Sequence, residues 1–175
     1  MKTKKLYLLR HAKSSWKEFS IKDFDRPLNK RGKRDAPFMA EQMAKKGIHP
    51  DIILCSPAKR AKSTAKHFSE KLQADIIYNS AIYEASALTL KEIIKEAFKH
   101  YDEIMLVGHN PSLTMLTNSF TNHQIDNIPT AGIVGFEFDI QTIKGAKTTL
   151  LFFEYPKKYL KVNTVVDNSC QEREL

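Results

Sequence analysis

The chain has 175 residues, of which 42% are hydrophobic and 27% are charged, a balance typical of a soluble globular protein with one core. The formal net charge is +8, which favours anionic partners. No apolar run approaches the roughly 20 residues that a membrane helix needs. We therefore predict one domain over residues 1–175 without a membrane partner.

The two ends of the chain and its cysteines bear on the compartment. The basic start is followed by an apolar run over residues 6–9 only, which is too short for a signal peptide. Cys55 and Cys170 are too few for a disulfide framework or a cysteine metal site. These features predict a reduced, cytoplasmic setting. The tail after about residue 168 is polar, and we expect it to be frayed.

In chain order, the first predicted element is a buried strand over residues 4–9. Residues 12–29 show no clean helical period and predict a long loop with at most one helical turn. A helix follows over residues 30–46 because its apolar residues share one face, and Gly47 is expected to end it.

The remaining elements continue the alternation of strands and helices. Strands are predicted at residues 51–55, 75–78, 103–107, 133–138 and 148–155, and helices at residues 57–72, at residues 89–99 and from Pro111 onward. Ser56-Pro57 and Asn110-Pro111 are expected to cap and open two of these helices, and Thr89 with Glu92 a third. The pattern predicts a three-layer α/β/α fold with a mostly parallel six-stranded sheet.

Functional side chains follow three of the predicted strands. The first strand ends in Arg10 and His11, the helix after the second carries Arg60 in its first turn, and His109 follows the fourth. If these strands are parallel, all four side chains meet at the edge where ligands bind in open α/β sheets. Arginine binds phosphate oxygens bidentately, so the set predicts a pocket for one phosphoryl group. Each residue alone is more ordinarily structural or solvated, and only the joint placement supports a site.

Motifs that the sequence lacks reduce the number of reaction types possible in such a pocket. Neutral imidazole can attack phosphorus and form a covalent intermediate. The sequence contains neither the Cys-x5-Arg loop of cysteine phosphatases nor a phosphate-binding Gly-x4-Gly-Lys-[Ser/Thr] loop. Its histidines lack helical metal spacing and its acids are scattered. We therefore expect phosphoryl chemistry on histidine, without a metal or another cofactor.

Four motifs resemble those of the histidine phosphatase superfamily, which includes phosphoglycerate mutases and acid phosphatases. They are Leu8-Leu9-Arg10-His11-Ala12, the run Ser-Pro-Ala-Lys-Arg-Ala-Lys-Ser-Thr-Ala over residues 56–65, Val107-Gly108-His109-Asn110, and the run Asp-Arg-Pro-Leu over residues 25–28 with Arg31-Gly32. The last is similar to the small branch typified by the phosphohistidine phosphatase SixA. Ala12 replaces the usual glycine, which the backbone tolerates if φ stays below zero.

The resemblance implies a role for each matching residue. His11 would be the nucleophile that becomes phosphorylated, and Arg10 and Arg60 would bind the phosphoryl oxygens. His109 would bind the same oxygens as a cation, while His11 must be neutral to attack. Glu84 lies in a short motif where many relatives keep a proton donor, and we retain it as the candidate acid.

We therefore predict a phosphatase that acts through a phosphohistidine intermediate on phosphohistidine in a protein. A small-molecule phosphomonoester phosphatase stays open as the alternative, and the complete four-residue set argues against a binding module without turnover. Nucleic acid is disfavoured because the basic residues are not interleaved with aromatic ones. The sequence leaves open the oligomeric state, whether loop 12–29 closes over the ligand, where Trp16 packs, and whether Asp25 and Arg26 pair or shape the pocket mouth.

Overall fold

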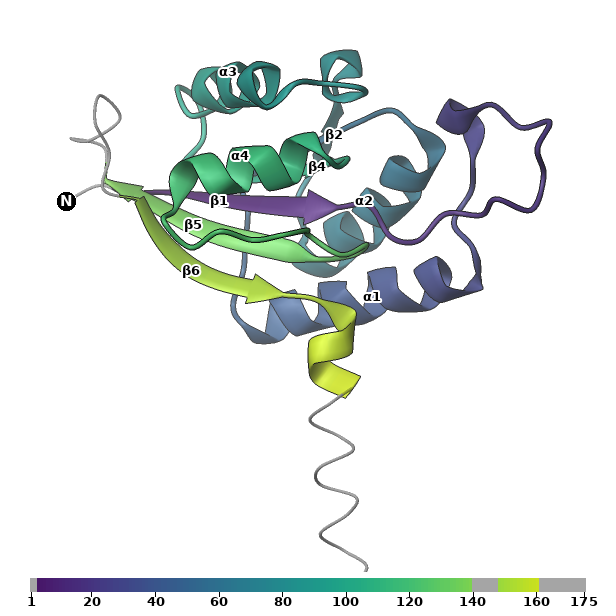
Figure 1. The fold of residues 1–175 in the computed structure, drawn as a ribbon. Helices are drawn as coiled ribbons and strands as arrows, with labels where there is room; N and C mark the ends of the chain where they lie inside the picture. The colour runs from purple at the N-terminus through teal and green to yellow at the C-terminus, as the bar shows by residue number, and fades with distance from the viewer. Residues whose placement is uncertain (1–2, 140–147, 161–175) are drawn as a thin grey trace, which may run out of the picture.

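The first strand of the chain lies inside the sheet, between two other strands. Its run of apolar side chains is buried and therefore requires cover on both faces. The computed structural model describes residues 3–139 and 148–160 (Figure 1). The strands are β1 (Thr3–Arg10), β2 (Ile52–Cys55), β3 (Ile76–Tyr78), β4 (Glu103–Gly108), β5 (Ile133–Asp139) and β6 (Thr148–Glu154). The helices are α1 (Lys30–Lys45), α2 (Lys59–Leu72), α3 (Ala87–Ala97) and α4 (Ser112–Phe120), with 3₁₀ turns η1 (Asp23–Asp25) and η2 (Ser80–Ile82).

The sheet has the strand order β3-β2-β4-β1-β5-β6. Its β1–β4, β2–β4 and β2–β3 pairings are parallel, and its β1–β5 and β5–β6 pairings are antiparallel. The prediction of a mostly parallel, six-stranded sheet is confirmed. Residues after about 168, where we expect a frayed tail, and Cys170 lie outside the described part of the chain.

The two faces of β1 belong to different cores. Leu6 and Leu8 pack in the cluster that includes side chains of α3 and α4, whereas Tyr7 and Leu9 pack in the cluster with α1 and α2. Figure 1 shows these two pairs of helices on opposite faces of the sheet. The alternation of side chains along one strand therefore produces the predicted three layers.

The carboxyl ends of β1, β2 and β4 lie at one edge of the sheet. Val107 of β4 pairs with Leu9 of β1 and with Cys55 of β2, and Arg10 pairs with Gly108. In-register parallel pairing thus places the residues that follow these strands beside one another. The predicted common edge is confirmed.

Three predicted helix starts are wrong by one to three residues. Ala58 and Pro111 stand at the N-cap positions of α2 and α4, and α3 begins after Ser86, whose hydroxyl accepts from the backbone N–H of Thr89. Ser56 instead bonds to a histidine of the site, and Asn110 donates to Asn127. These polar groups make tertiary hydrogen bonds in place of the expected caps.

The long loop after β1 projects from a closed base. Ser14 and Leu28 form an antiparallel bridge, and the backbone N–H of Asn29 donates to the carbonyl oxygen of Lys13. That carbonyl lies so near Gly32 that a Cβ there would come within 2.2 Å of its oxygen. The glycine of the Arg-Gly motif therefore permits the loop base to rest against α1. The predicted single helical turn is confirmed as η1.

Candidate active site

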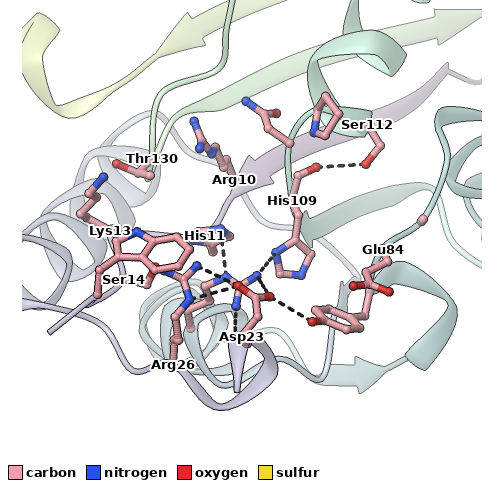
Figure 2. A pocket seen from close by; sticks show the side chains of 16 residues that line it. Arg10, His11, Lys13, Ser14, Asp23, Arg26, Glu84, His109, Ser112 and Thr130 are labelled. Carbon is pink, nitrogen blue, oxygen red and sulfur yellow. Dashed lines mark hydrogen bonds and ion pairs between the residues drawn. The ribbon is translucent and has the colours of Figure 1, made fainter. Parts of the chain in front are cut away.

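A cavity of about 590 Å³ lies at the common edge of β1, β2 and β4. All five predicted site residues, Arg10, His11, Arg60, Glu84 and His109, line it. Figure 2 labels four of them, Arg10, His11, Glu84 and His109, together with loop residues that also reach the cavity. The geometric prediction that Arg10, His11, Arg60 and His109 converge is therefore confirmed, and the chemical roles of all five residues stay predictions.

Hydrogen bonds fix the tautomer of His11. Nδ1 lies 2.8 Å from the carbonyl oxygen of Ala12, which can only accept, so Nδ1 carries the proton. Nε2 accepts from Nε of Arg60 at 3.2 Å and therefore presents a lone pair. Ala12 is not among the residues with positive φ, so its methyl group is accommodated as predicted. In this arrangement His11 is neutral, with the lone pair of Nε2 directed at Arg60.

Hydrogen bonds also fix the tautomer of His109, but here the proton is on Nε2 and the lone pair on Nδ1. Its Nε2 donates to the hydroxyl oxygen of Ser56 at 2.7 Å, and its Nδ1 accepts from Nη2 of Arg60 at 3.3 Å. The same serine oxygen accepts from the backbone N–H of Ala58 at the start of α2. In this arrangement His109 is neutral, and protonation of Nδ1 would require Arg60 to give up its contact there.

Burial lowers the pKa values of both imidazoles. Burial lowers the pKa of His11 to about 3, with further lowering by His109, Arg60 and Arg10 against the opposing bond to Ala12. Burial, followed by the charge of Arg60, lowers the pKa of His109 to about 4. The charge of Asp23 opposes this lowering at His109. The negative charge of a phosphoryl group beside the ring would favour the cationic form further, and the predicted role of His109 as a cation stays a prediction.

Both terminal nitrogens of Arg60 donate hydrogen bonds to the loop residue Asp23. Nη1 donates to the backbone carbonyl oxygen of Asp23 at 2.6 Å, and Nη2 donates to its Oδ2 at 2.9 Å. Tyr83 donates to the same Oδ2 at 2.9 Å. Burial works against ionisation of this carboxylate, but the hydrogen bonds from Tyr83 and Arg60 outweigh it and lower the pKa of Asp23. One carboxylate oxygen and the backbone carbonyl oxygen of Asp23 thus occupy the arginine fork that suits a phosphoryl group.

Arg26 extends the cationic wall of the cavity. Its Nε donates to Oδ1 of Asp23 at 3.1 Å, so its ion pair is with Asp23 and not with the alternative partner, Asp25. The guanidinium carbon lies 3.4 Å from the ring centroid of Trp16, which also lines the cavity. Nη1 is buried without a partner among the described residues. A bound anion could satisfy this donor.

Arg10 is anchored from the opposite side. Its Nη1 donates to the carbonyl oxygen of Ile128 at 2.7 Å, and burial lowers the pKa of its guanidinium. Its Nε has no partner among the described residues. Two arginines therefore present buried N–H groups for which the described residues provide no acceptor.

Glu84 reaches the cavity from the turn before α3. Its backbone has φ of 55°, a left-handed conformation that is uncommon for a glutamate, and its side chain is exposed at the rim. Figure 2 shows it on the opposite side of the cavity from Lys13 and Thr130. Its placement is compatible with a proton donor at the mouth.

The sequence reasoning missed two contributors, Asp23 and Ser56. Asp23 lies three residues before Arg26 in a loop, and this spacing was the only local signal for their contact. Ser56 matched a helix cap in sequence, and its contact with His109 spans 53 residues. Among the residues that the structure describes, no cluster of three or more histidine, cysteine, aspartate or glutamate side chains could hold a metal ion. In the same ranges no helix is long and apolar enough to span a membrane.

Comparison with known proteins assigns the family. The family model for the histidine phosphatase superfamily (branch 1) matches residues 6–97, which is more than half of the chain. The chain belongs to this superfamily. The match contains Arg10, His11, Arg60 and Glu84, whereas the inclusion of His109 in the site rests on the geometry described above.

Several proteins align with substantial parts of the chain. A chloroplastic protein of Arabidopsis thaliana is 34% identical over 62% of this chain, and a protein of Mycobacterium leprae is 31% identical over 71% of it. The phosphoserine phosphatase 1 of Hydrogenobacter thermophilus is 30% identical over 57% of this chain. The alignments span 55%, 84% and 47% of these three relatives, respectively.

Solved structures confirm the fold and the resemblance to the SixA branch. A protein from Agrobacterium tumefaciens, provisionally named phosphohistidine phosphatase SixA, superposes with a TM-score of 0.77 at 30% identity and covers 87% of this chain and 99% of its own. A protein histidine phosphatase SixA complexed with tungstate has a TM-score of 0.76 at 15% identity, with coverages of 89% and 99%, and supports the fold alone. Together with the family match, these likenesses support a phosphatase enzyme.

Proposed function

We propose that this protein is a metal-independent phosphatase that transfers a phosphoryl group to Nε2 of His11 and then to water, and that its substrate is phosphohistidine in a protein. The observation that carries the reaction is the state of His11. Its Nδ1 proton is bound to the Ala12 carbonyl oxygen, and its Nε2 lone pair lies 3.2 Å from Arg60, a phosphate-binding type of side chain.

Substrate binding begins with an exchange of anions. The phosphoryl group takes the place of the Asp23 carboxylate at Nη2 of Arg60, and Arg10 and Arg26 donate to it through N–H groups that lack partners among the described residues. Its negative charge raises the pKa of His109, whose Nδ1 then takes up a proton and donates to a phosphoryl oxygen. Ser56 continues to accept from Nε2 of this ring. The substrate thereby produces the predicted pair of one neutral and one cationic histidine.

Two in-line displacements complete the reaction. In the first, the Nε2 lone pair of His11 forms a bond to phosphorus as the bond from phosphorus to the substrate nitrogen breaks. The leaving imidazole nitrogen receives a proton, for which Glu84 at the mouth is the candidate donor. In the second, water attacks phosphorus and gives its proton to the Glu84 carboxylate left by the first step, as the bond from phosphorus to Nε2 of His11 breaks. Inorganic phosphate leaves, and His11 returns to its neutral form.

A protein substrate is favoured by the mouth of the cavity. Trp16 and Phe19, on the projecting loop, are 64% and 98% exposed, and aromatic side chains are enriched at protein–protein interfaces. The likeness to proteins named SixA points to the same substrate class. Phosphohistidine also requires only a weak acid, because an imidazole nitrogen accepts a proton near neutral pH. The exposed position of Glu84 is compatible with that modest demand.

A small phosphomonoester is the second candidate. It is favoured by the alignment with the phosphoserine phosphatase 1 of Hydrogenobacter thermophilus. A mycobacterial glucosyl-3-phosphoglycerate phosphatase in complex with VO₃ also shares the fold, with a TM-score of 0.70 at 14% identity. We also propose that the protein works in the cytoplasm and that residues 1–175 form one domain.

The test is to trap the phosphoenzyme. The protein is mixed with a ³²P-labelled protein that has been phosphorylated on histidine by phosphoramidate, quenched in alkali and digested. We expect an alkali-stable, acid-labile label on His11. His11→Asn should lose the label and retain its circular dichroism spectrum, whereas His49→Asn, at an exposed histidine outside the cavity, should keep both label and turnover. Residual turnover of His11→Asn above about 1% would contradict covalent catalysis.

Substrate class and metal independence are tested with the same protein. We expect kcat/KM to be higher for phosphohistidine protein than for phosphoserine or sugar phosphates. A tenfold preference for one of these small substrates, about 1.4 kcal/mol in the barrier, would favour the second candidate. Dialysis against EDTA should leave turnover intact, and a loss restored by Mg²⁺ would contradict metal independence.

A further inference from the structure

A second cavity of about 410 Å³ adjoins the catalytic one. The two share Arg10, Lys13 and Thr130 in their linings, so they form adjacent parts of one depression. Figure 2 shows these three residues on the side of the catalytic cavity away from Glu84. From there the second cavity continues between the start of α1 and the helical residues 156–160 after β6. A bound substrate could extend from the phosphoryl site in this direction.

The second cavity is strongly cationic. Its charged side chains are Arg10, Lys13, Arg31, Arg34, Lys157 and one acid, Asp35. Asp35 is buried and lies 2.9 Å from Nη2 of Arg34 and 3.9 Å from Nε of Arg31, so its charge is already shared. The lining therefore carries a formal excess of four positive charges. This is half the net charge of the whole chain, gathered around one depression.

Contacts within the protein account for this cluster only in part: Asp35 pairs with Arg31 and Arg34, and Nη2 of Arg31 donates to Oγ1 of Thr130 at 3.3 Å. The first turn of α1 contains no acidic residue, although acids are stabilising at a helix N-terminus and cations are not. Lys13 and Lys157 form no ion pair within the described ranges. Arg31 and Arg34 keep 47% and 64% of their side chains exposed. The cations are thus available to a partner, at a small cost to the helix that presents two of them.

We propose that this second cavity binds acidic side chains of the protein segment that carries the phosphorylated residue, an inference that rests on the proposed function. Charge complementarity selects an anionic occupant. The cavity adds about 410 Å³ beyond the phosphoryl site, and its exposed arginines suit a chain that crosses the surface better than an enclosed metabolite. The enzyme therefore selects phosphorylated segments with glutamate or aspartate on the flank that reaches Lys157.

The test uses matched phosphohistidine peptides whose flanking residues are either glutamate or glutamine, on the amino or the carboxyl side. For the native protein we expect kcat/KM to favour the acidic peptide on one of the two sides. In the double variant Arg34→Gln/Lys157→Gln the ratio of acidic to neutral peptide should fall about fivefold, which is about 1 kcal/mol for the two exposed charge pairs together.

The matched control is Lys91→Gln/Lys95→Gln, which removes the same charge from exposed positions on α3, across the sheet from α1. An equal fall in this control would assign the preference to overall charge and overturn the inference. A native ratio near one on both sides would also overturn it. If neither peptide is cleaved while a small phosphomonoester is, the proposed function fails instead. If the double variant does not fold, the single variant Lys157→Gln replaces it in the test. We expect it to lower the ratio of acidic to neutral peptide by less than the double variant would.

Discussion

Asp23 and the guanidinium of Arg60 form a two-point contact in the lining of the catalytic cavity. Nη2 of Arg60 donates to Oδ2, and Nη1 donates to the backbone carbonyl oxygen of the same aspartate. Arg60 lies at the start of α2 and Asp23 in the projecting loop, so their contact joins the loop to α2 in the lining of the cavity. A substrate phosphoryl group must compete with this carboxylate for the same arginine.

Replacing Asp23 with asparagine should strengthen the binding of inhibitory anions. The variant keeps the size of the side chain and removes the charge that occupies Arg60. Because the Asp23 side chain is 48% exposed, solvent screening limits the effect to about 1 kcal/mol. We expect the Ki of vanadate to fall about threefold to tenfold. Asp25→Asn, on the same loop but without a contact to Arg60, is the control. Weaker vanadate binding by Asp23→Asn would show that Asp23 positions Arg60 for the anion.

The stability of the anion-free protein should fall as the pH is lowered from about 6.5 to about 4. The pKa values of His11 and His109 in the folded protein are about 3 and about 4, below the usual value for histidine. In this window the unfolded chain binds protons that the native protein does not, so unfolding becomes more favourable as the pH falls. Each histidine should contribute about 1 kcal/mol per pH unit to the slope of the unfolding free energy.

Urea denaturation at several pH values, in buffers without phosphate or sulfate, measures this slope. His11→Asn and His109→Asn should each reduce it, whereas His49→Asn should leave it unchanged because that histidine is exposed. Slopes in the two cavity variants equal to that of the native protein would contradict neutral imidazoles in the empty pocket. Addition of vanadate should also flatten the slope, since the anion favours a protonated His109.

The local pattern of the sequence was sufficient to predict the strands of the sheet and which residues meet at most of the site. The ends of β1, β2 and β4 follow from apolar runs, and parallel register then brings Arg10, His11 and His109 to one edge. The helix starts were less predictable because a serine or asparagine before a helix has two possible uses. Ser56 serves His109, which lies far away in sequence, and only the fold shows which use prevails. Asp23 escaped prediction for the same reason, as its partner Arg60 is 37 residues away.

Removing the Ser56 hydroxyl should impair catalysis through His109. Ser56→Ala leaves the buried Nε2–H of that ring without its acceptor, which costs about 1–3 kcal/mol and frees the ring to turn. We expect kcat/KM to fall by about tenfold or more, with an altered acid limb in its pH profile. Ser63→Ala removes a hydroxyl of α2 that, among the described residues, bonds only to the Lys59 carbonyl oxygen, and it should have little effect. A uniform loss without a change in the pH profile would point to a merely structural role.

The leaving group should determine how much Glu84 matters. An alkoxide needs a strong general acid, because the pKa of an alcohol is far above neutral, whereas an imidazole nitrogen can be protonated near neutral pH. Glu84→Gln keeps the shape of the side chain but cannot donate the proton. We therefore expect this variant to lose at least tenfold in kcat/KM on an alkyl phosphate such as phosphoserine and much less on phosphohistidine, with p-nitrophenyl phosphate close to the latter. Glu92→Gln, at an exposed site on α3, is the control. Equal losses on all three substrates would contradict a role as proton donor and assign Glu84, with its left-handed backbone, to the shape of the mouth.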